Sequence, residues 1–169
     1  MSENIKRILD ANEEYSKEYN KKAIPGIKPA RRLAILTCMD TRIDPLRFAG
    51  LKKGDAHIIR NAGGRASDDA IRSLVLSSRL LGTNEWLVVH HTDCGQENFS
   101  NEEVCKLMRD TSDSGEGDFI NWLTISDRTQ SVKDDVRRIR NHPLVPGDVT
   151  IYGFLFEVET GRLKEIISE

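Results

Sequence analysis

Residues 33–37 read Leu-Ala-Ile-Leu-Thr, an uninterrupted apolar run behind the basic pair Arg31-Arg32. The run is too short for a helix, so it predicts a strand that is buried on both faces. Residues 86–90, Trp-Leu-Val-Val-His, predict a second strand of the same kind. A sheet that contains such strands has to be covered on both sides by other parts of the chain.

Helical and strand patterns alternate along the rest of the chain. Apolar spacing, caps and breakers predict helices over residues 3–20, from Ser67 to Gly82, from the capping box Ser100 and Glu103 to about Arg109, and through Val132, Val136 and Ile139 to a stop before Pro143. Further strands are predicted over residues 56–60, 149–156 and 162–167, a loop over 111–118, and a glycine-bearing turn with a close backbone approach over 61–64. The alternation predicts an α/β fold with a mainly parallel sheet flanked by helices, an antiparallel C-terminal edge strand and an N-terminal helical extension.

The size and charge of the chain narrow its class. With 169 residues, it is expected to form a single domain over residues 1–169. A formal net charge of -2 gives no reason to expect nucleic acid or an anionic membrane as a partner. No apolar run reaches the ~20 residues of a membrane span, and residues 1–20 are too polar for a signal peptide, so a cytoplasmic protein acting on a small molecule is expected. Three cysteines without a secretory signal favour metal or redox chemistry over disulfides.

Two polar segments directly follow the two buried strands. Residues 38–42 read Cys-Met-Asp-Thr-Arg, and residues 91–95 read His-Thr-Asp-Cys-Gly. Ligands of α/β sheets bind beyond the carboxyl ends of the strands, which is where both segments lie. Cys38, His91 and Cys94 offer the soft and borderline donors that suit one tetrahedral zinc ion, and the fourth position has no obvious protein donor. An open fourth position is typical of a catalytic metal.

Asp40 and Arg42 are expected to form a fork-shaped ion pair that keeps the carboxylate ionised and fixes its direction. Asp40 would then accept the proton of a zinc-bound hydroxide and aim its lone pair at an electrophilic carbon. If the pair broke, Asp40 itself could bind the metal. Two thiolates lower the pKa of a bound water less than three histidines do, for which it is about 7, so activity is expected to rise toward alkaline pH.

Simpler interpretations exist for most of these residues. Either cysteine could be a small buried apolar side chain, which is the interpretation adopted for Cys105. The Asp40–Arg42 pair could be a surface ion pair that contributes little to the stability of the fold, and Asp93 could simply cap its turn. The remaining histidines receive no role: His90 should point to the opposite sheet face from His91, and His57 and His142 are treated as ordinary polar positions.

Three segments in this order, residues 38–42, 60–64 (Arg-Asn-Ala-Gly-Gly) and 91–95, resemble the β-class carbonic anhydrase family. The resemblance continues through residues 69–73 and into the tail around 152–154 and 160–163. It implies that Cys38, His91 and Cys94 bind zinc, that Asp40 is either the fourth ligand or the partner of zinc-bound water, and that Arg42 pairs with Asp40. It also implies a homodimer or higher homo-oligomer in which the N-terminal helix, within residues 1–24, packs on a neighbouring subunit.

The resemblance leaves the substrate open. Reversible hydration of CO2 to bicarbonate is the first hypothesis, but members of the same family hydrolyse carbonyl sulfide or carbon disulfide with the same ligands. One departure bears on the choice: Gln96 follows Cys94-Gly95 where many relatives carry an apolar residue. A non-catalytic zinc-stabilised module and a cysteine redox protein are further alternatives; the first would usually recruit a fourth Cys or His, and the second needs a resolving thiol.

Overall fold

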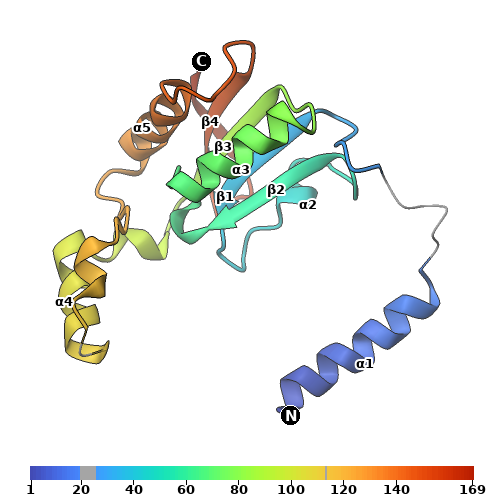
Figure 1. Ribbon diagram of the computed structural model, residues 1–169, viewed down its shortest axis with the longest axis horizontal. Coiled ribbons are helices and arrows are strands. Elements are labelled where there is room, and N and C mark those ends of the chain that lie inside the picture. Colours follow the sequence, from blue (N-terminus) through green and yellow to red (C-terminus); the bar gives the residue numbers. More distant parts are fainter. Residues whose placement is uncertain (20–25, 113) are drawn as a thin grey trace.

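The computed structural model describes residues 1–19, 26–112 and 114–169. In the described residues, strands pair in the order β2-β1-β3-β4-β5 to form one sheet (Figure 1). The strands are β1 (Leu33–Cys38), β2 (Ala56–Asn61), β3 (Glu85–His91), β4 (Thr150–Phe156) and β5 (Leu163–Ser168), each within one residue of the predicted range at either end. The first four run parallel, and β5 lies antiparallel to β4 at the edge. The predicted fold class is therefore confirmed.

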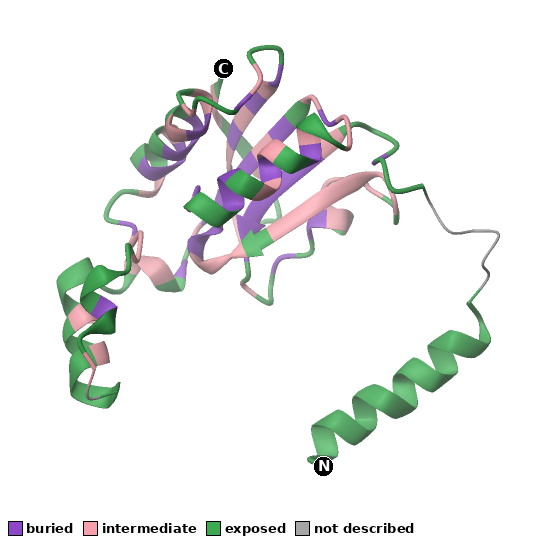
Figure 2. Cartoon of the chain, in the orientation of Figure 1, coloured by how far each residue is buried: buried purple, intermediate pink, exposed green. Residues whose placement is uncertain are grey.

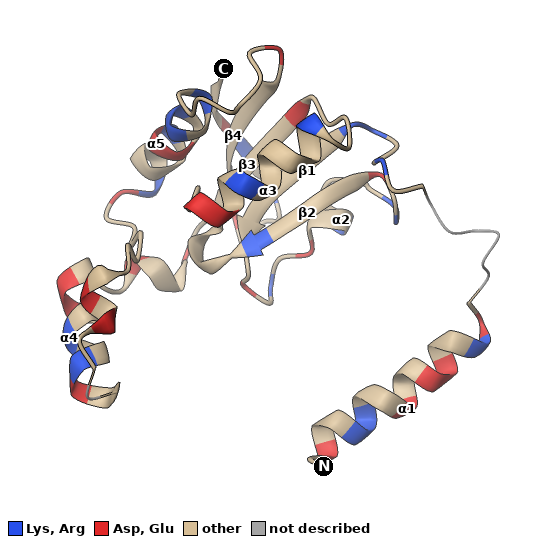
Figure 3. Ribbon diagram, viewed as in Figure 1, with Lys and Arg blue, Asp and Glu red and all other residues tan. Residues whose placement is uncertain are grey.

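Helices α3 (Asp68–Arg79) and α5 (Arg128–Arg140) pack on one face of the sheet. Ser67 caps α3, and its acidic first turn and the basic last turn of α5 suit the helix dipoles (Figure 3). The buried apolar cluster on this face includes Leu36, Trp86, Val88, Ile151, Ile71, Leu74, Val136 and Ile139. This cluster packs the sheet against α3 and α5 and so fixes the positions of the strand ends.

The opposite face carries a second cluster that includes Ile35, Val89 and Phe156. Part of it is covered by α2 (Pro45–Phe48), a short helix that the sequence analysis did not predict. The Asp44 carboxylate accepts hydrogen bonds from the backbone N–H groups of the first turn, at 3.2 Å from Leu46 N and Arg47 N. One turn is too short for a helical period to show in a sequence, which explains the omission.

Helix α4 (Asn101–Ser112) runs past the predicted end at Arg109. The predicted capping box is present, because Ser100 N donates to Glu103 Oε2 at 2.7 Å and Glu103 N donates to Ser100 Oγ at 3.2 Å. The predicted loop over 111–118 is wrong at both ends, since α4 continues to Ser112 and a short 3-10 helix, η4 (Glu116–Phe119), follows. No glycine or proline stands between residues 109 and 112 to end the helix; residue 113 lies outside the described residues.

Helix α1 (Glu3–Lys17) lies apart from the sheet (Figure 1), and every one of its residues is exposed (Figure 2). The prediction of a helix is confirmed up to Lys17; its predicted end at residue 20 lies outside the described residues. An apolar side that includes Ile5, Ile8 and Leu9 faces solvent. Among the described residues, no helix is both long and apolar enough to cross a bilayer.

Candidate metal centre

The carboxyl ends of β1 and β3 bring the predicted ligands together. Cys38 is the last residue of β1, His91 is the last residue of β3, and these two strands are parallel neighbours. Cys94 stands on the turn that leads from β3 into the short 3-10 helix η3 (Gly95–Glu97). The three side chains are buried, and one potential ligand atom from each lies within 4.8 Å of the other two. The structure thus assembles one compact Cys-His-Cys cluster.

The imidazole of His91 is oriented for ligation. Its Nδ1 lies 2.9 Å from the carbonyl oxygen of Thr92, which can only accept a hydrogen bond, so Nδ1 carries the proton. Its Nε2 is buried and has no hydrogen-bond partner in the structure. A buried unpaired nitrogen costs free energy, and a metal ion between this atom and the two sulfurs would remove the cost. The observation fits a metal site.

The two thiols of the cluster do not titrate alike. A hydrogen bond from Cys94 lowers the pKa of Cys38 despite burial, whereas the thiolate of Cys38 and burial raise the pKa of Cys94. The pair therefore holds one proton between two sulfurs. Thiolate is the form that binds metal, so a bound cation would replace that proton. Two thiolates and a neutral imidazole are a donor set typical of tetrahedral zinc.

Asp40 lies beside this cluster in the predicted ion pair. Arg42 donates from Nε to Asp40 Oδ1 at 3.0 Å and from Nη2 to Oδ2 at 2.7 Å. These hydrogen bonds hold the pKa of the Asp40 carboxyl well below its usual range. Oδ2 of Asp40 is 3.9 Å from Nε2 of His91, so an ionised carboxylate borders the ligand cluster while Arg42 holds it in place.

Asp93 binds the other side of Arg42, a contact that the sequence analysis missed. Its Oδ2 accepts from Arg42 Nη1 at 2.6 Å, and its backbone oxygen accepts from Nη2 at 2.9 Å. The alternative interpretation of Asp93 as a turn cap finds no support, because within the described residues the Asp93 carboxylate hydrogen-bonds to Arg42 and to no backbone N–H group of the turn.

The segment Arg60–Gly64 contacts the backbone of the segment that carries Cys38 and Asp40. Arg60 at the end of β2 donates to the carbonyl oxygens of Cys38 (2.9 Å) and Asp40 (2.6 Å). Gly64 has a φ of +68°, and a Cβ on it would lie 2.8 Å from the backbone nitrogen of Cys38. Only glycine fits there, so the predicted close backbone approach is confirmed.

A buried charged network stands behind His91 on the helix side of the sheet. Asp135 of α5 accepts from Arg65 Nε at 2.7 Å and lies 3.1 Å from Nε2 of His90. Burial raises the pKa of Asp135, but the hydrogen bonds from His90 and Arg65 outweigh this and lower it. His90 therefore faces away from His91, as the alternation along a strand predicts.

No sequence pattern predicts this network, because Asp135 is 45 residues from His90 and 70 residues from Arg65. The other two histidines also lie outside the cluster. Ser77 Oγ is 2.7 Å from His57 Nδ1, and Leu144 N donates to His142 Nδ1 at 3.3 Å.

A cavity of about 480 Å³ lies over the cluster. Its lining includes Cys38, Cys94 and the Asp40–Arg42 pair, so a small molecule that enters it reaches all four side chains. The remaining lining residues are Met39, Thr41, Ala62, Gly63, Gly95 and Gln96.

Comparisons with known proteins agree with this site. The model of the family described as "Carbonic anhydrase" matches residues 33–163. The β-carbonic anhydrase 1 of Mycobacterium tuberculosis is 41% identical over 140 residues, covering 82% of this chain and 83% of that protein. A carbon disulfide hydrolase of an Acidianus species is 38% identical over 183 residues, covering 95% of this chain and 90% of that protein.

Solved structures of carbonic anhydrases and of a carbon disulfide hydrolase are also similar to this chain. The carbonic anhydrase of Streptococcus mutans superposes with a TM-score of 0.91 at 41% identity, covering 99% of each chain. The apo form of a carbon disulfide hydrolase superposes with a TM-score of 0.74 at 39% identity, covering 98% of this chain and 91% of that one. The chain belongs to the β-carbonic anhydrase family, in which carbonic anhydrases and carbon disulfide hydrolases both occur.

Proposed function

We propose that this protein is a zinc enzyme that catalyses the reversible hydration of CO2 to bicarbonate. One observation carries the proposal: the unpaired Nε2 of His91 lies with two cysteine sulfurs in a buried cluster, directly beside a carboxylate that an arginine keeps ionised. Three protein donors with an adjacent base are what metal-assisted hydration requires.

Cys38, His91 and Cys94 would hold one zinc ion per chain. When bound there, zinc lowers the pKa of a water molecule toward neutrality and so supplies a nucleophile. The ion pair with Arg42 keeps the Asp40 carboxylate out of the ligand set and leaves the fourth position to a small molecule. If Arg42 released it, Asp40 is close enough to become the fourth ligand itself and block the site.

Asp40 and Arg42 are the proposed catalytic residues. Oδ2 of Asp40 borders the cluster, where it would accept a hydrogen bond from the attacking oxygen and thereby orient that oxygen toward the carbon of CO2. Arg42 provides the charge that keeps Asp40 ionised and the two hydrogen bonds that fix its direction.

The substrate assignment is supported by the cavity and by the relatives. Thr41 and Gln96 give the cavity over the cluster polar side chains that can hydrogen-bond to the bicarbonate anion. The solved carbonic anhydrases of Streptococcus mutans and Glaciozyma antarctica also superpose more closely, with TM-scores of 0.91 and 0.88, than the carbon disulfide hydrolase does.

Hydrolysis of carbon disulfide or carbonyl sulfide, with release of H2S, is the second candidate function. It is favoured by the 38% identity to a carbon disulfide hydrolase over nearly the whole chain. Like CO2, carbon disulfide and carbonyl sulfide are small, linear molecules without charge, and the same cluster would serve hydration or hydrolysis. Discrimination would then depend on the lining of the cavity and not on the ligands.

The exposed apolar side of α1 supports a homodimer or higher homo-oligomer. Ile5, Ile8 and Leu9 are between 47% and 61% exposed on a helix that buries none of its residues. A second copy of the chain is the proposed partner for this side. Sedimentation equilibrium would give a multiple of 19.1 kDa, whereas a monomer at micromolar concentration would contradict the assignment.

The experiment that tests the catalytic assignment is CO2 hydration by the Asp40→Asn variant. The change removes the base and the ion pair with little change in size, so we expect kcat/KM to fall by ~10²- to 10³-fold with zinc still bound. Arg42 lowers the pKa of Asp40, so a contribution from ionised Asp40 is present at neutral and alkaline pH and is lost only in strong acid. The wild-type rate should therefore show no inflection from Asp40 at neutral pH.

Stopped-flow measurement of both proteins, with zinc content determined on the same samples, checks this result. Asp68→Asn is the matched control, because Asp68 is an exposed acid in an ion pair with Arg138. Undiminished hydration by Asp40→Asn would remove Asp40 from the mechanism, whereas absence of hydration in the zinc-loaded wild type as well would favour a zinc site that only stabilises the fold.

A further inference from the structure

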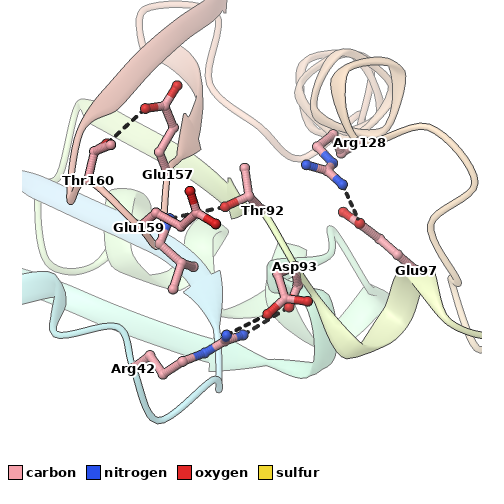
Figure 4. A pocket seen from close by; sticks show the side chains of 9 residues that line it. Arg42, Thr92, Asp93, Glu97, Arg128, Glu157, Glu159 and Thr160 are labelled. Atoms are coloured by element: carbon pink, nitrogen blue, oxygen red, sulfur yellow. Dashed lines mark hydrogen bonds and ion pairs between the residues drawn. The ribbon is translucent and has the colours of Figure 1, made fainter.

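The guanidinium of Arg42 is held from two sides. Nε and Nη2 donate to the carboxylate of Asp40, while Nη1 and Nη2 donate to the carboxylate and the backbone oxygen of Asp93. Figure 4 shows Asp93 and Arg42 facing each other at the border of a second cavity, of about 810 Å³. Four hydrogen bonds from one planar group fix both its position and its plane.

The turn that presents Asp93 is itself anchored. Thr92, the preceding residue, donates from its backbone nitrogen to Phe156 O at 3.0 Å, and its Oγ1 accepts from Val158 N at 3.0 Å (Figure 4). Asp93 has a φ of 55°, in the left-handed region that non-glycine residues seldom occupy. In this conformation the carboxylate and the carbonyl oxygen of Asp93 both meet Arg42. A left-handed residue on an anchored turn, with two of its oxygens bound to one guanidinium, is suited to a positioning function.

Stability alone does not account for the contact. The Asp93 side chain is 80% exposed and that of Arg42 is 43% exposed, and ion pairs this open to water add little to the free energy of folding. The contact instead restricts rotation of the guanidinium, and through it the direction of the Asp40 carboxylate. Small errors in the direction of a catalytic base lower the rate of a reaction.

We propose that Asp93 is a positioning residue that fixes the guanidinium of Arg42 so that Arg42 aims Asp40 at the reacting molecule. The expected effect of Asp93 on the rate of CO2 hydration rests on the proposed function. The expected effect of Asp93 on the mobility of the Arg42 guanidinium does not depend on that function. Asp93 thus belongs to the apparatus of the site although its side chain supplies no ligand atom to the cluster.

Two variants of the zinc-loaded protein distinguish the contribution of the Asp93 carboxylate from that of the Asp93 backbone conformation. Asp93→Asn keeps the shape and tolerates the left-handed conformation but loses the charge, whereas Asp93→Gly loses the side chain and relieves the backbone. Asp68→Asn, which breaks the exposed pair with Arg138 on α5, is again the matched control. The readouts are kcat and KM for CO2 hydration, zinc content, and solvent exchange of the Arg42 guanidinium hydrogens in ¹⁵N-arginine-labelled protein.

We expect both Asp93 variants to lower kcat about threefold to fivefold with KM unchanged and one zinc per chain retained. The Arg42 hydrogens should exchange faster in both, while Asp68→Asn leaves rate and exchange unaltered. Wild-type kcat and exchange in either Asp93 variant would overturn the proposal. If the wild-type protein did not hydrate CO2, the proposed function would fail, yet the exchange rates would still test whether Asp93 positions Arg42.

Discussion

Replacing Cys94 by serine is expected to abolish both metal binding and CO2 hydration. The change removes one of two thiolates and leaves a hydroxyl that stays protonated and ligates zinc poorly. Loss of an outer partner of a metal ligand already costs about 10- to 100-fold in affinity or activity, so loss of a ligand should cost more than about 100-fold. Elemental analysis of the purified variant, together with stopped-flow hydration, measures both effects.

Cys105→Ser is the matched control for this experiment. Cys105 is half-buried in α4, where its Sγ lies 3.6 Å from the carbonyl oxygen of Gly117 and outside the ligand cluster. This variant should retain one zinc per chain and wild-type activity. A Cys94→Ser protein that kept its zinc and its rate would show that the cluster is not the metal site, and loss of zinc in Cys105→Ser would point to a different ligand set.

The second large effect is expected on stability, in the Asp135→Asn variant. Asp135 is only 2% exposed and balances the charge of Arg65, which is 8% exposed. Removing one partner of a buried pair leaves the other charge without compensation and costs ~3–5 kcal/mol. We therefore expect the free energy of unfolding, measured by urea titration, to fall by about that amount.

Asp134→Asn is the control on the same helix. Asp134 is exposed and accepts a hydrogen bond from Gln130, so its substitution should change the free energy of unfolding by less than about 0.5 kcal/mol. The pKa of Asp135 is lowered in the folded protein, so its stabilisation is present above the usual carboxyl pKa and is lost as the pH falls through the folded value. Equal unfolding free energies of Asp135→Asn and the wild type would contradict the importance of the buried network.

The strands and long helices could be predicted because their signals are local. The apolar runs of β1 and β3 and the caps Ser67 and Ser100 identify elements without knowledge of the rest of the fold. Helix α2 is a single turn and has no periodic signal, although Asp44 followed by Pro45 marks its start. The end of α4 lacks a breaker. Such features depend on local hydrogen bonds and on packing.

Part of the candidate site could likewise be predicted from the sequence, and part could not. Cys38 and His91 could be placed together because parallel strands end at one edge of a sheet, and Asp40 and Arg42 are close enough in sequence to pair. The partners of Asp93 and Asp135 could not be predicted, because Arg42 and Arg65 reach them across 51 and 70 residues. Contacts of this range depend on the strand order and on the packing of α5, which a sequence pattern does not encode.

The most direct test of the proposed activity is a paired assay on one zinc-loaded preparation. CO2 hydration is followed by stopped flow, and sulfide release is followed with carbonyl sulfide and with carbon disulfide as substrates. We predict fast hydration that collapses in Asp40→Asn, with negligible release of sulfide from either sulfur compound. Fast release of sulfide with negligible hydration of CO2 would contradict the assignment and identify the chain as a hydrolase of these sulfur compounds.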